Sequence, residues 1–331
     1  MQSSDSGLTR VGGSVRGASD PSLLRFVADL YFIRDWSEAR IAKLLGCSRS
    51  KVSRLISAAR AQGIVQIALV PEPKILEPLA EELASAIGIS VSITPGQSSE
   101  AAASGRICAV AAAPMIAGEL PTEGVIGVAG GYTVSTLVDA LPRASRPGLV
   151  VVPIVGSYYV QDSNLDVNAV ASSLARTLGA SGRRILAPGL LDSLDTKMAL
   201  LQDSTVRATT ALWSQLDFVL VGVSGSPHDH PGYPTVMDQL DGDGRRRLAA
   251  KGVVGEVAGH LLGRDGSIVE DEWTSRALSI PFDLLRSFQR VVGVSAGSAK
   301  IDGIVAAVRS GVLKRLITDE PTARAILKLE R

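Results

Sequence analysis

The chain has 331 residues, of which 46% are hydrophobic, 20% charged and 4% aromatic, and its formal net charge is +1. This balance excludes a disordered chain and a polycation, and the length allows two or three domains with a large buried core. No apolar run approaches the roughly 18–20 residues of a membrane span. With no hydrophobic secretory core either, we expect a cytoplasmic protein without a membrane partner.

The N-terminal part divides into a tail and a first helix. Residues 1–20 are rich in Ser, Gly and Arg without periodicity, which predicts a flexible tail. Pro21 suits a first helical turn. The apolar residues that follow at helical spacing predict an amphipathic helix bracing the next segment: Leu24, Val27, Ala28 and Tyr31.

The stretch Ser37–Gly63 predicts two short helices joined by a tight turn. Gly46 suits the left-handed end of the first helix, over Glu38–Leu45, and Ser48 can cap the second. Residues 21–63 carry eight Lys or Arg against three Asp or Glu, a local charge of +5, so the remainder is slightly acidic. These features predict an all-α helix-turn-helix domain over residues 21–70.

The second of these helices combines an apolar stripe with an outward face of cations and hydroxyl groups. Such a face suits the phosphates and base edges of a DNA major groove. The residues predicted to contact DNA are Ser48, Arg49, Ser50, Lys51, Ser53 and Arg54. The alternative is an ordinary surface hairpin whose charges are solvated.

Beyond a predicted strand at Ile64–Val70, residues 71–88 are predicted to be a proline-marked linker with a helix over Ile75–Ile87. From 89 to 331, apolar strands alternate with helices, which predicts a large, doubly wound, mostly parallel α/β domain. The predicted strands are Ser90–Thr94, Gly124–Val128, Leu149–Ile154, Arg184–Ala187, Asp217–Val223, Arg290–Val294 and Arg315–Thr318. The predicted helices are Ser99–Ala117, Thr133–Leu141, Asp166–Leu178, Thr205–Gln215, Gly244–Lys251, Ala299–Arg309 and Glu320–Leu329.

Ligands of such sheets gather at the carboxyl ends of the strands. In the turn Gly127–Ser135, a strand runs into glycines and then a helix whose first turn carries Thr133 and Ser135. Glycines let backbone N–H groups approach an anion, so this turn favours a phosphate. It matches neither a dinucleotide fingerprint nor a Walker loop, and tight strand–helix packing is the alternative explanation.

Three further turns share this character: Gly293–Lys300, Gly222–Ser226 and Pro153–Ser157. In the first of them, Gly297 and Ser298 lie beside Lys300, which is either a phosphate partner or a solvated cation. Several hydroxyl-bearing turns in one sheet indicate a polar, phosphorylated small molecule.

Metal and catalytic signals are weak. His228, Asp229 and His230 fit a solvated loop better than a metal site, and Asp192 and Asp195 fit helix capping as well as a role near a sugar. No nucleophile elbow or catalytic Cys/His pair is present. We therefore expect no cofactor, no metal and no enzymatic activity.

The chain resembles the SorC/DeoR-type sugar-binding transcriptional regulators over roughly residues 23–327. The strings that carry the resemblance are AKLLGCSRSKVSRLISAARAQGIVQI (42–67), IGVAGGYTVSTLVDALP (126–142), VVPIVG (151–156), NAVASSLARTLGA (168–180), DFVLVGVSGS (217–226), VVGEVAGHLLGRDG (253–266), RVVGVSAGSAKIDGIVAAVRSG (290–311) and LITDEPTARAIL (316–327). The resemblance implies that 89–331 is an effector and oligomerisation domain, similar in fold to glucosamine-6-phosphate deaminase and ribose-5-phosphate isomerase.

The resemblance also implies a phosphorylated sugar or polyol as effector. By position, Gly130, Gly131 and Thr133 match the phosphate loop, Lys300 matches the lysine after the second glycine turn, and Glu256 matches an acidic residue near the sugar. Asn168 matches an asparagine of the ligand-cleft helix. The complete predicted effector set is Gly130, Gly131, Thr133, Ser135, Asn168, Gly225, Glu256, Gly297 and Lys300.

The chain departs from the family pattern in three places. Asp166 and Ala169 replace the usual Asn/Glu-rich helix start, which puts hydroxyl recognition in doubt. Val155 stands where some members carry a lysine able to form a Schiff base, so covalent capture of the effector is not expected. The segment Pro227–Pro234 matches no pattern.

Two functions compete. The first is a ligand-responsive regulator that binds double-stranded operator DNA as a homodimer or homotetramer, because a single head with few phosphate contacts binds weakly. The second is a sugar-phosphate isomerase or deaminase carrying a DNA-binding head. That activity needs an acid/base pair, for which the sequence offers only Asp192, Asp195 and Glu256.

Overall fold

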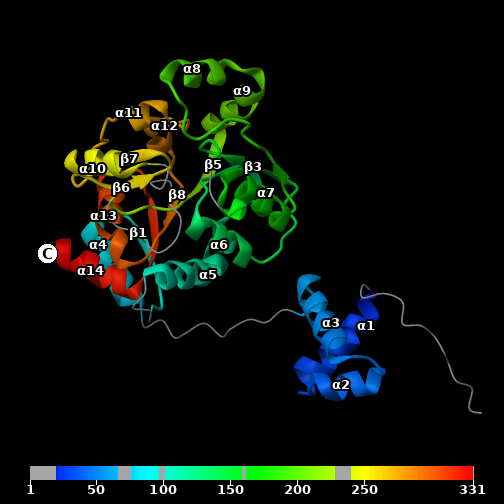
Figure 1. Ribbon diagram of the computed structural model, residues 1–331. Coiled ribbons are helices and arrows are strands. Elements are labelled where there is room, and N and C mark those ends of the chain that lie inside the picture. Colours follow the sequence, from blue (N-terminus) through cyan, green and yellow to red (C-terminus); the bar gives the residue numbers. More distant parts are fainter. Residues whose placement is uncertain (1–19, 66–75, 97–100, 159–161, 228–239, 331) are drawn as a thin grey trace, which may run out of the picture. The chain divides into compact units, whose positions relative to one another are not determined.

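The computed structural model describes residues 20–65, 76–96, 101–158, 162–227 and 240–330. The chain forms two compact units, Met1–Pro73 and Lys74–Arg331 (Figure 1). The predicted tail and most of the strand predicted at Ile64–Val70 lie outside the described residues, as do both histidines of the Pro227–Pro234 segment. Within the described ranges, no helix is both long and apolar enough to cross a membrane.

The N-terminal unit contains α1 (Pro21–Ala28), the π-helical turn η1 (Asp29–Ile33), α2 (Glu38–Leu45) and α3 (Arg49–Ala61). The π-helical turn was not predicted. It widens the end of the first helix. An ion pair spans this turn, because Arg34 Nε lies 2.7 Å from a carboxylate oxygen of Asp29, five residues earlier. The predicted apolar stripes meet in one small core, which includes Leu24, Val27, Ile41, Val52 and Leu55.

The second unit is built on a seven-stranded sheet in the order β1-β9-β8-β5-β2-β3-β4, in which every pair is parallel. The strands are β1 (Ser90–Thr94), β2 (Glu123–Val128), β3 (Gly148–Pro153), β4 (Ser181–Gly182), β5 (Leu216–Val221), β8 (Val291–Val294) and β9 (Arg315–Asp319). A separate antiparallel hairpin pairs β6 (Val253–Val257) with β7 (His260–Gly263). The mostly parallel α/β class predicted from the sequence is confirmed.

Helices connect the strands. The α-helices are α4 (Glu77–Ile87), α5 (Ala101–Glu119), α6 (Tyr132–Ala140), α7 (Val167–Leu178), α8 (Leu194–Gln202), α9 (Ser204–Thr210), α10 (Gly242–Ala250), α11 (Glu272–Arg276), α12 (Phe282–Ser287), α13 (Ile301–Arg309) and α14 (Glu320–Glu330). Short 3-10 turns are η2 (Ser163–Leu165), η3 (Ala211–Gln215) and η5 (Ser298–Lys300). Because α4 packs against β1 and α14, it belongs to the second unit rather than to a separate linker.

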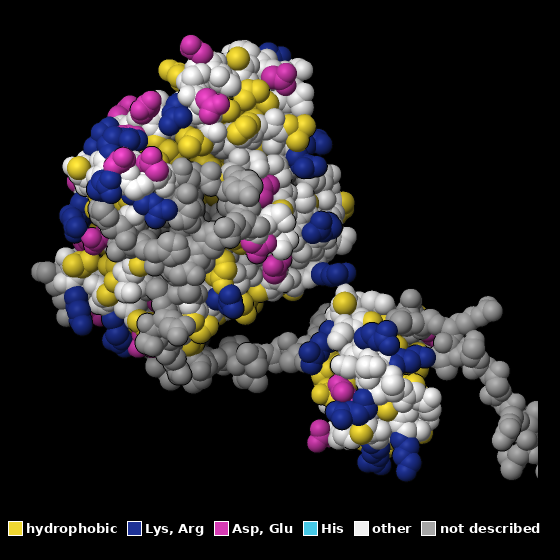
Figure 2. Space-filling model, in the orientation of Figure 1, with side chains coloured by type: hydrophobic (Ala, Val, Ile, Leu, Met, Phe, Trp, Pro, Cys, Tyr) yellow, Lys and Arg dark blue, Asp and Glu magenta, His cyan; other side chains and the backbone are white. Residues whose placement is uncertain are grey.

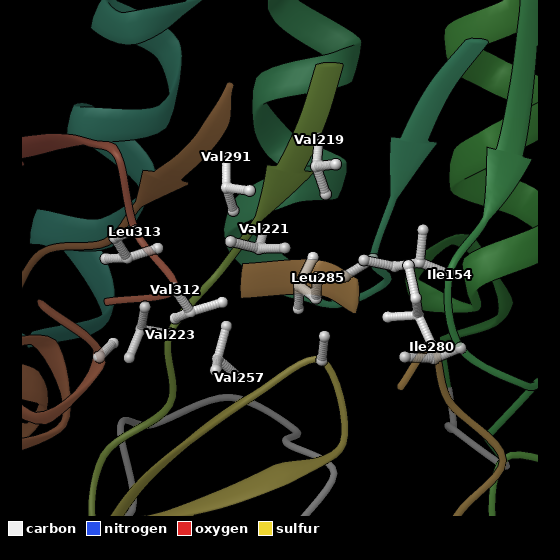
Figure 3. Packing of buried hydrophobic residues seen from close by; sticks show 14 of the residues in the cluster. Ile154, Val219, Val221, Val223, Val257, Ile280, Leu285, Val291, Val312 and Leu313 are labelled. Atoms are coloured by element: carbon white, nitrogen blue, oxygen red, sulfur yellow. The ribbon is translucent and has the colours of Figure 1, made fainter. Parts of the chain in front are cut away.

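Alternating residues of the central strands point into two cores, one on each face of the sheet. On β5, Phe218 and Leu220 join the core under α5, α6 and α7, whereas Val219 and Val221 join the opposite core. Figure 3 shows Val219 and Val221 in the second core with Val291 and Leu285. Burial on both faces explains why these strands are almost continuously apolar.

Three sequence predictions differ from the structure. Among the described residues, 184–187 form no strand, because Asn168 takes the backbone N–H and carbonyl of Ile185 with its side-chain amide, at 2.8 and 3.1 Å. Within the described part of this segment, Ser181–Gly182 is the stretch that pairs with β3 as a strand. The helix predicted over Thr205–Gln215 ends at Thr210 and continues as the 3-10 turn η3. The region between Lys251 and Arg290, left without elements, contains β6, β7, α11 and α12.

Candidate functional site

The helix-turn-helix has the local geometry that its sequence predicts. Gly46 adopts φ 62° at the end of α2, and the Ser48 hydroxyl accepts a hydrogen bond from the Lys51 N–H at 3.3 Å at the start of α3. These two features fix where α3 begins. The helix therefore presents its apolar side to the small core and its polar side outward.

The outward face of α3 is cationic. Ser48, Arg49, Ser50, Ser53 and Arg54 are exposed and Lys51 is half-buried. Within the described residues, none of the three cations on this face forms an ion pair, although Arg54 donates to the carbonyl of Ser50 at 3.3 Å. Figure 2 shows Lys and Arg side chains gathered on this unit. Unpaired cations on one helix face are the local charge that DNA phosphates attract.

In the second unit, a pocket lies at the point where the order of the strands in the sheet reverses. From β2 the chain crosses through α6 to β3, whereas from β5 it proceeds to β8 and β9 on the other side. The carboxyl ends of two such strands form a crevice in which α/β proteins bind ligands. The cavity there measures about 110 Å³, several times the roughly 10–15 Å³ that one water molecule requires.

Five of the predicted effector residues line this pocket: Gly130, Gly131, Thr133, Glu256 and Lys300. Lys300 is 5% exposed and Thr133 is 3% exposed, and the Lys300 ammonium donates to the Thr133 hydroxyl at 3.4 Å. A buried ammonium group at the carboxyl ends of the strands attracts an anion strongly.

The helix α6 begins at this pocket. Gly131, at φ 104°, precedes its first residue, and no described side chain caps the helix. Gly130 packs closely, since a methyl group there would lie 3.0 Å from the carbonyl oxygen of Leu165. The first N–H groups of an uncapped helix carry partial positive charge, which adds to that of Lys300.

Glu256 adds a carboxyl group to the lining of the pocket. It lies on β6, next to the end of β5, and one of its oxygens accepts a hydrogen bond from the Gly259 N–H at 2.6 Å. Burial raises the pKa of Glu256, while the bonds from Gly259 and the Ser224 hydroxyl and the charge of Lys300 partly oppose that rise. The pocket thus combines an anion-binding side with a carboxyl group that can bind hydroxyls.

The other four predicted residues have structural contacts outside this pocket. Ser135 donates to the Asn164 carbonyl at 3.1 Å, and both amide atoms of Asn168 are bonded to Ile185. A methyl group at Gly225 would lie 1.9 Å from the carbonyl oxygen of Ala299, so this glycine allows β5 to approach the turn that carries Lys300. Gly297 donates to the Thr322 hydroxyl at 2.8 Å.

Several lining residues are absent from the predicted effector set: Tyr158, Asp166, Ser224 and Gly259. Ser224 lies inside a turn that the sequence had singled out, and Tyr158 directly follows another. Gly259 lies in the hairpin turn that was not predicted. Val155 also lines the pocket.

The carboxylates required by the enzymatic alternative do not converge. Asp192 and Asp195 are exposed at the start of α8 and are absent from the described lining, which leaves Glu256 without a partner acid from this set. Among the described residues, no group of three or more His, Cys, Asp or Glu side chains is arranged to hold a metal.

A helix-turn-helix unit joined to an α/β body with a polar pocket defines a ligand-responsive transcriptional regulator. The chain belongs to the Sugar-bind family of sugar-binding domains, whose model matches residues 79–328. It is 27% identical over 323 residues to the sorbitol operon regulator of Klebsiella pneumoniae, covering 95% of this chain and 100% of that protein. The erythritol catabolism regulatory protein EryD of Brucella abortus is 25% identical over 311 residues, covering 93% and 97%.

The comparison with solved structures agrees with the comparison of sequences. The crystal structure of the full-length sorbitol operon regulator SorC from Klebsiella pneumoniae matches with a TM-score of 0.70 and 26% identity, covering 93% of this chain and 99% of that one. These relatives are named regulators of transcription or catabolism and not enzymes. The regulator interpretation of the sequence is therefore confirmed, and the isomerase or deaminase alternative is not favoured.

Proposed function

We propose that this regulator binds double-stranded operator DNA through α3 and binds a phosphorylated sugar or polyol in the pocket formed by Lys300, Thr133 and Glu256. The observation that carries the proposal is the buried Lys300 ammonium, 3.4 Å from the Thr133 hydroxyl at the uncapped start of α6. Cation, hydroxyl and helix N-terminus on one side of a pocket together favour a phosphate.

Other residues of the pocket lining support binding of the sugar or polyol part of the ligand. Glu256 and Ser224 offer oxygen atoms that can accept and donate hydrogen bonds to carbon-bound hydroxyls. The relatives described above are named for sorbitol and erythritol, both linear polyols. A linear polyol phosphate is therefore the first ligand class to test.

For DNA, the docking surface consists of Ser48, Arg49, Ser50, Lys51, Ser53 and Arg54, with α3 in the major groove. One such head makes few phosphate contacts and binds weakly at physiological salt. We propose that the protein acts as a homodimer or homotetramer held together by the second unit, so that paired heads read a palindromic operator. The effector then acts by changing how two heads are presented, a coupling of about 1–3 kcal/mol.

The test is a thermal-shift and calorimetric screen of the full chain. D-sorbitol 6-phosphate, D-erythritol 4-phosphate and inorganic phosphate are compared with unphosphorylated sorbitol and erythritol, because a specific ligand raises the melting temperature by mass action. We expect shifts from the phosphorylated polyols and none from the free polyols at the same concentration. Equal shifts from free and phosphorylated polyols would refute the phosphate part of the proposal.

A further inference from the structure

Tyr158 is the one aromatic residue in the described pocket lining whose hydroxyl group has no hydrogen-bond partner among the described residues. The other lining tyrosine, Tyr132, receives hydrogen bonds from Arg106. The Tyr158 hydroxyl oxygen is also shielded from solvent, so among the described residues it is a buried polar atom without a partner. A buried polar group without a partner costs free energy, and such groups are rare in native proteins.

The ring of Tyr158 is held in place from two sides. It is stacked on the fully buried Trp273, with ring centroids 6.5 Å apart and planes inclined by 15°. On another side it touches Gly189, where a methyl group would lie 2.5 Å from a ring carbon. A ring confined in this way cannot turn its hydroxyl far from its present position, so the missing partner is not recovered by rotation.

The hydroxyl of Tyr158 lies close to the hairpin turn that holds Glu256. A methyl group built on Gly259 would lie 3.7 Å from the Tyr158 hydroxyl oxygen, and the N–H of the same Gly259 donates to Glu256. Burial raises the pKa of Tyr158, and the charge of Glu256 raises it further, so the hydroxyl keeps its proton. The protonated Tyr158 hydroxyl is therefore a donor without an acceptor among the described residues.

From this geometry we infer that Tyr158 is a specificity-determining residue, whose hydroxyl donates to a carbon-bound hydroxyl of the effector on the Glu256 side of the pocket. The inference rests on the proposed function, because it needs an effector whose anionic end is held by Lys300 and Thr133. Since Tyr158 and Lys300 line the same pocket from different elements, the effector must extend from one to the other. A polyol phosphate offers both an anionic end and carbon-bound hydroxyls, whereas inorganic phosphate offers no carbon-bound hydroxyl.

The experiment compares wild-type protein, Tyr158→Phe and the matched variant Tyr31→Phe in the N-terminal unit. Calorimetry measures the dissociation constants for inorganic phosphate, glycerol 3-phosphate, D-erythritol 4-phosphate and D-sorbitol 6-phosphate. We expect Tyr158→Phe to weaken the tightest-binding polyol phosphate by about three- to tenfold, the loss typical of one hydrogen bond, and to leave inorganic phosphate unchanged. Tyr31→Phe should match wild type throughout.

A second readout separates a ligand-facing hydroxyl from a structural one. Because the hydroxyl is unsatisfied without effector, Tyr158→Phe should leave the melting temperature of the unliganded protein unchanged or raise it. A lower melting temperature, or equal affinities of wild type and Tyr158→Phe for every polyol phosphate, would overturn the inference. If wild-type protein binds none of the phosphorylated probes, the proposed effector class fails, and the assignment of Tyr158 fails with it.

Discussion

The ammonium group of Lys300 donates a hydrogen bond to the hydroxyl of Thr133 at 3.4 Å, across 167 residues of sequence. Lys300 ends the 3-10 turn after β8, whereas Thr133 lies in the first turn of the helix after β2. The contact joins two strand-to-helix turns on either side of the point where the sheet reverses its order. It therefore gathers positive charge at the site where this fold binds ligands.

The first prediction concerns that ammonium group. Lys300→Met keeps most of the side-chain volume and removes the charge, and it should weaken the binding of D-sorbitol 6-phosphate by about tenfold or more, because a hydrogen bond to a charged group contributes about 1.5–3 kcal/mol. Calorimetry measures the loss. The exposed Lys328→Met is the matched control and should bind as wild type does. Equal affinity of the two variants would contradict a phosphate partner at Lys300.

The second prediction concerns pH. Burial raises the pKa of Glu256 above its ordinary value of 4.5, so the folded protein binds this proton more tightly than the unfolded chain does. The unliganded protein therefore loses stability from this group as the pH rises above about 4.5. Glu256→Gln removes the titration. Its melting temperature relative to wild type should rise as the pH increases above 4.5, and should level off once Glu256 is ionised in the folded protein.

In that comparison all other titrating groups are common to both proteins, so they cancel in the difference. A difference in melting temperature that is the same at every pH would mean that Glu256 titrates in the folded protein as it does in the unfolded chain.

The third prediction concerns DNA. The triple variant Arg49→Ala/Lys51→Ala/Arg54→Ala should bind promoter DNA more weakly and with a shallower dependence on salt. Each lost phosphate contact lowers the slope of log affinity against log salt by about 0.9, so three contacts lower it by roughly 2–3 per head. Fluorescence anisotropy at several salt concentrations measures both quantities.

The control for this variant removes three exposed cations from the second unit: Arg246→Ala/Arg324→Ala/Lys328→Ala. It should keep the wild-type slope. If both triple variants lose the same slope, the protein binds DNA through its charge in general and not through α3.

The fourth prediction concerns a close approach of two backbones. Gly225→Ala places a methyl group 1.9 Å from the carbonyl oxygen of Ala299, next to Lys300. Overpacking of this kind costs about 1–3 kcal/mol, and it should also displace Lys300 and weaken phosphate binding. Gly118→Ala, in α5 with open space around it, should be neutral or slightly stabilising. Unchanged stability of Gly225→Ala would show that the turn can move.

Features set by near neighbours could be predicted from the sequence. The start of α3 depends on Gly46 and Ser48, and the pocket glycines follow directly after an apolar strand, so short-range patterns were sufficient. The parallel sheet was also predictable, because its central strands are buried on both faces and read as continuous apolar runs.

Features set by contacts between residues distant in sequence could not be predicted from the sequence. Asn168 competes for the backbone of Ile185 and removes a predicted strand, which no local pattern indicates. In the turn between β6 and β7, Ala258 has φ 47°, a backbone conformation that alanine rarely adopts, so the sequence does not indicate this turn. The position of Tyr158 depends on Gly189 and Trp273, which are remote in sequence, so its place in the pocket emerged only from the fold.

The most direct test of the account measures the affinity of the full chain for a duplex from the promoter of its own operon, with and without saturating D-sorbitol 6-phosphate, in wild type and Lys300→Met. We predict that the polyol phosphate changes the wild-type affinity by about fivefold or more and leaves that of Lys300→Met unchanged. The contradicting result is an affinity for DNA that does not change with any phosphorylated polyol that the protein binds. It would mean that the pocket does not control DNA binding by the helix-turn-helix.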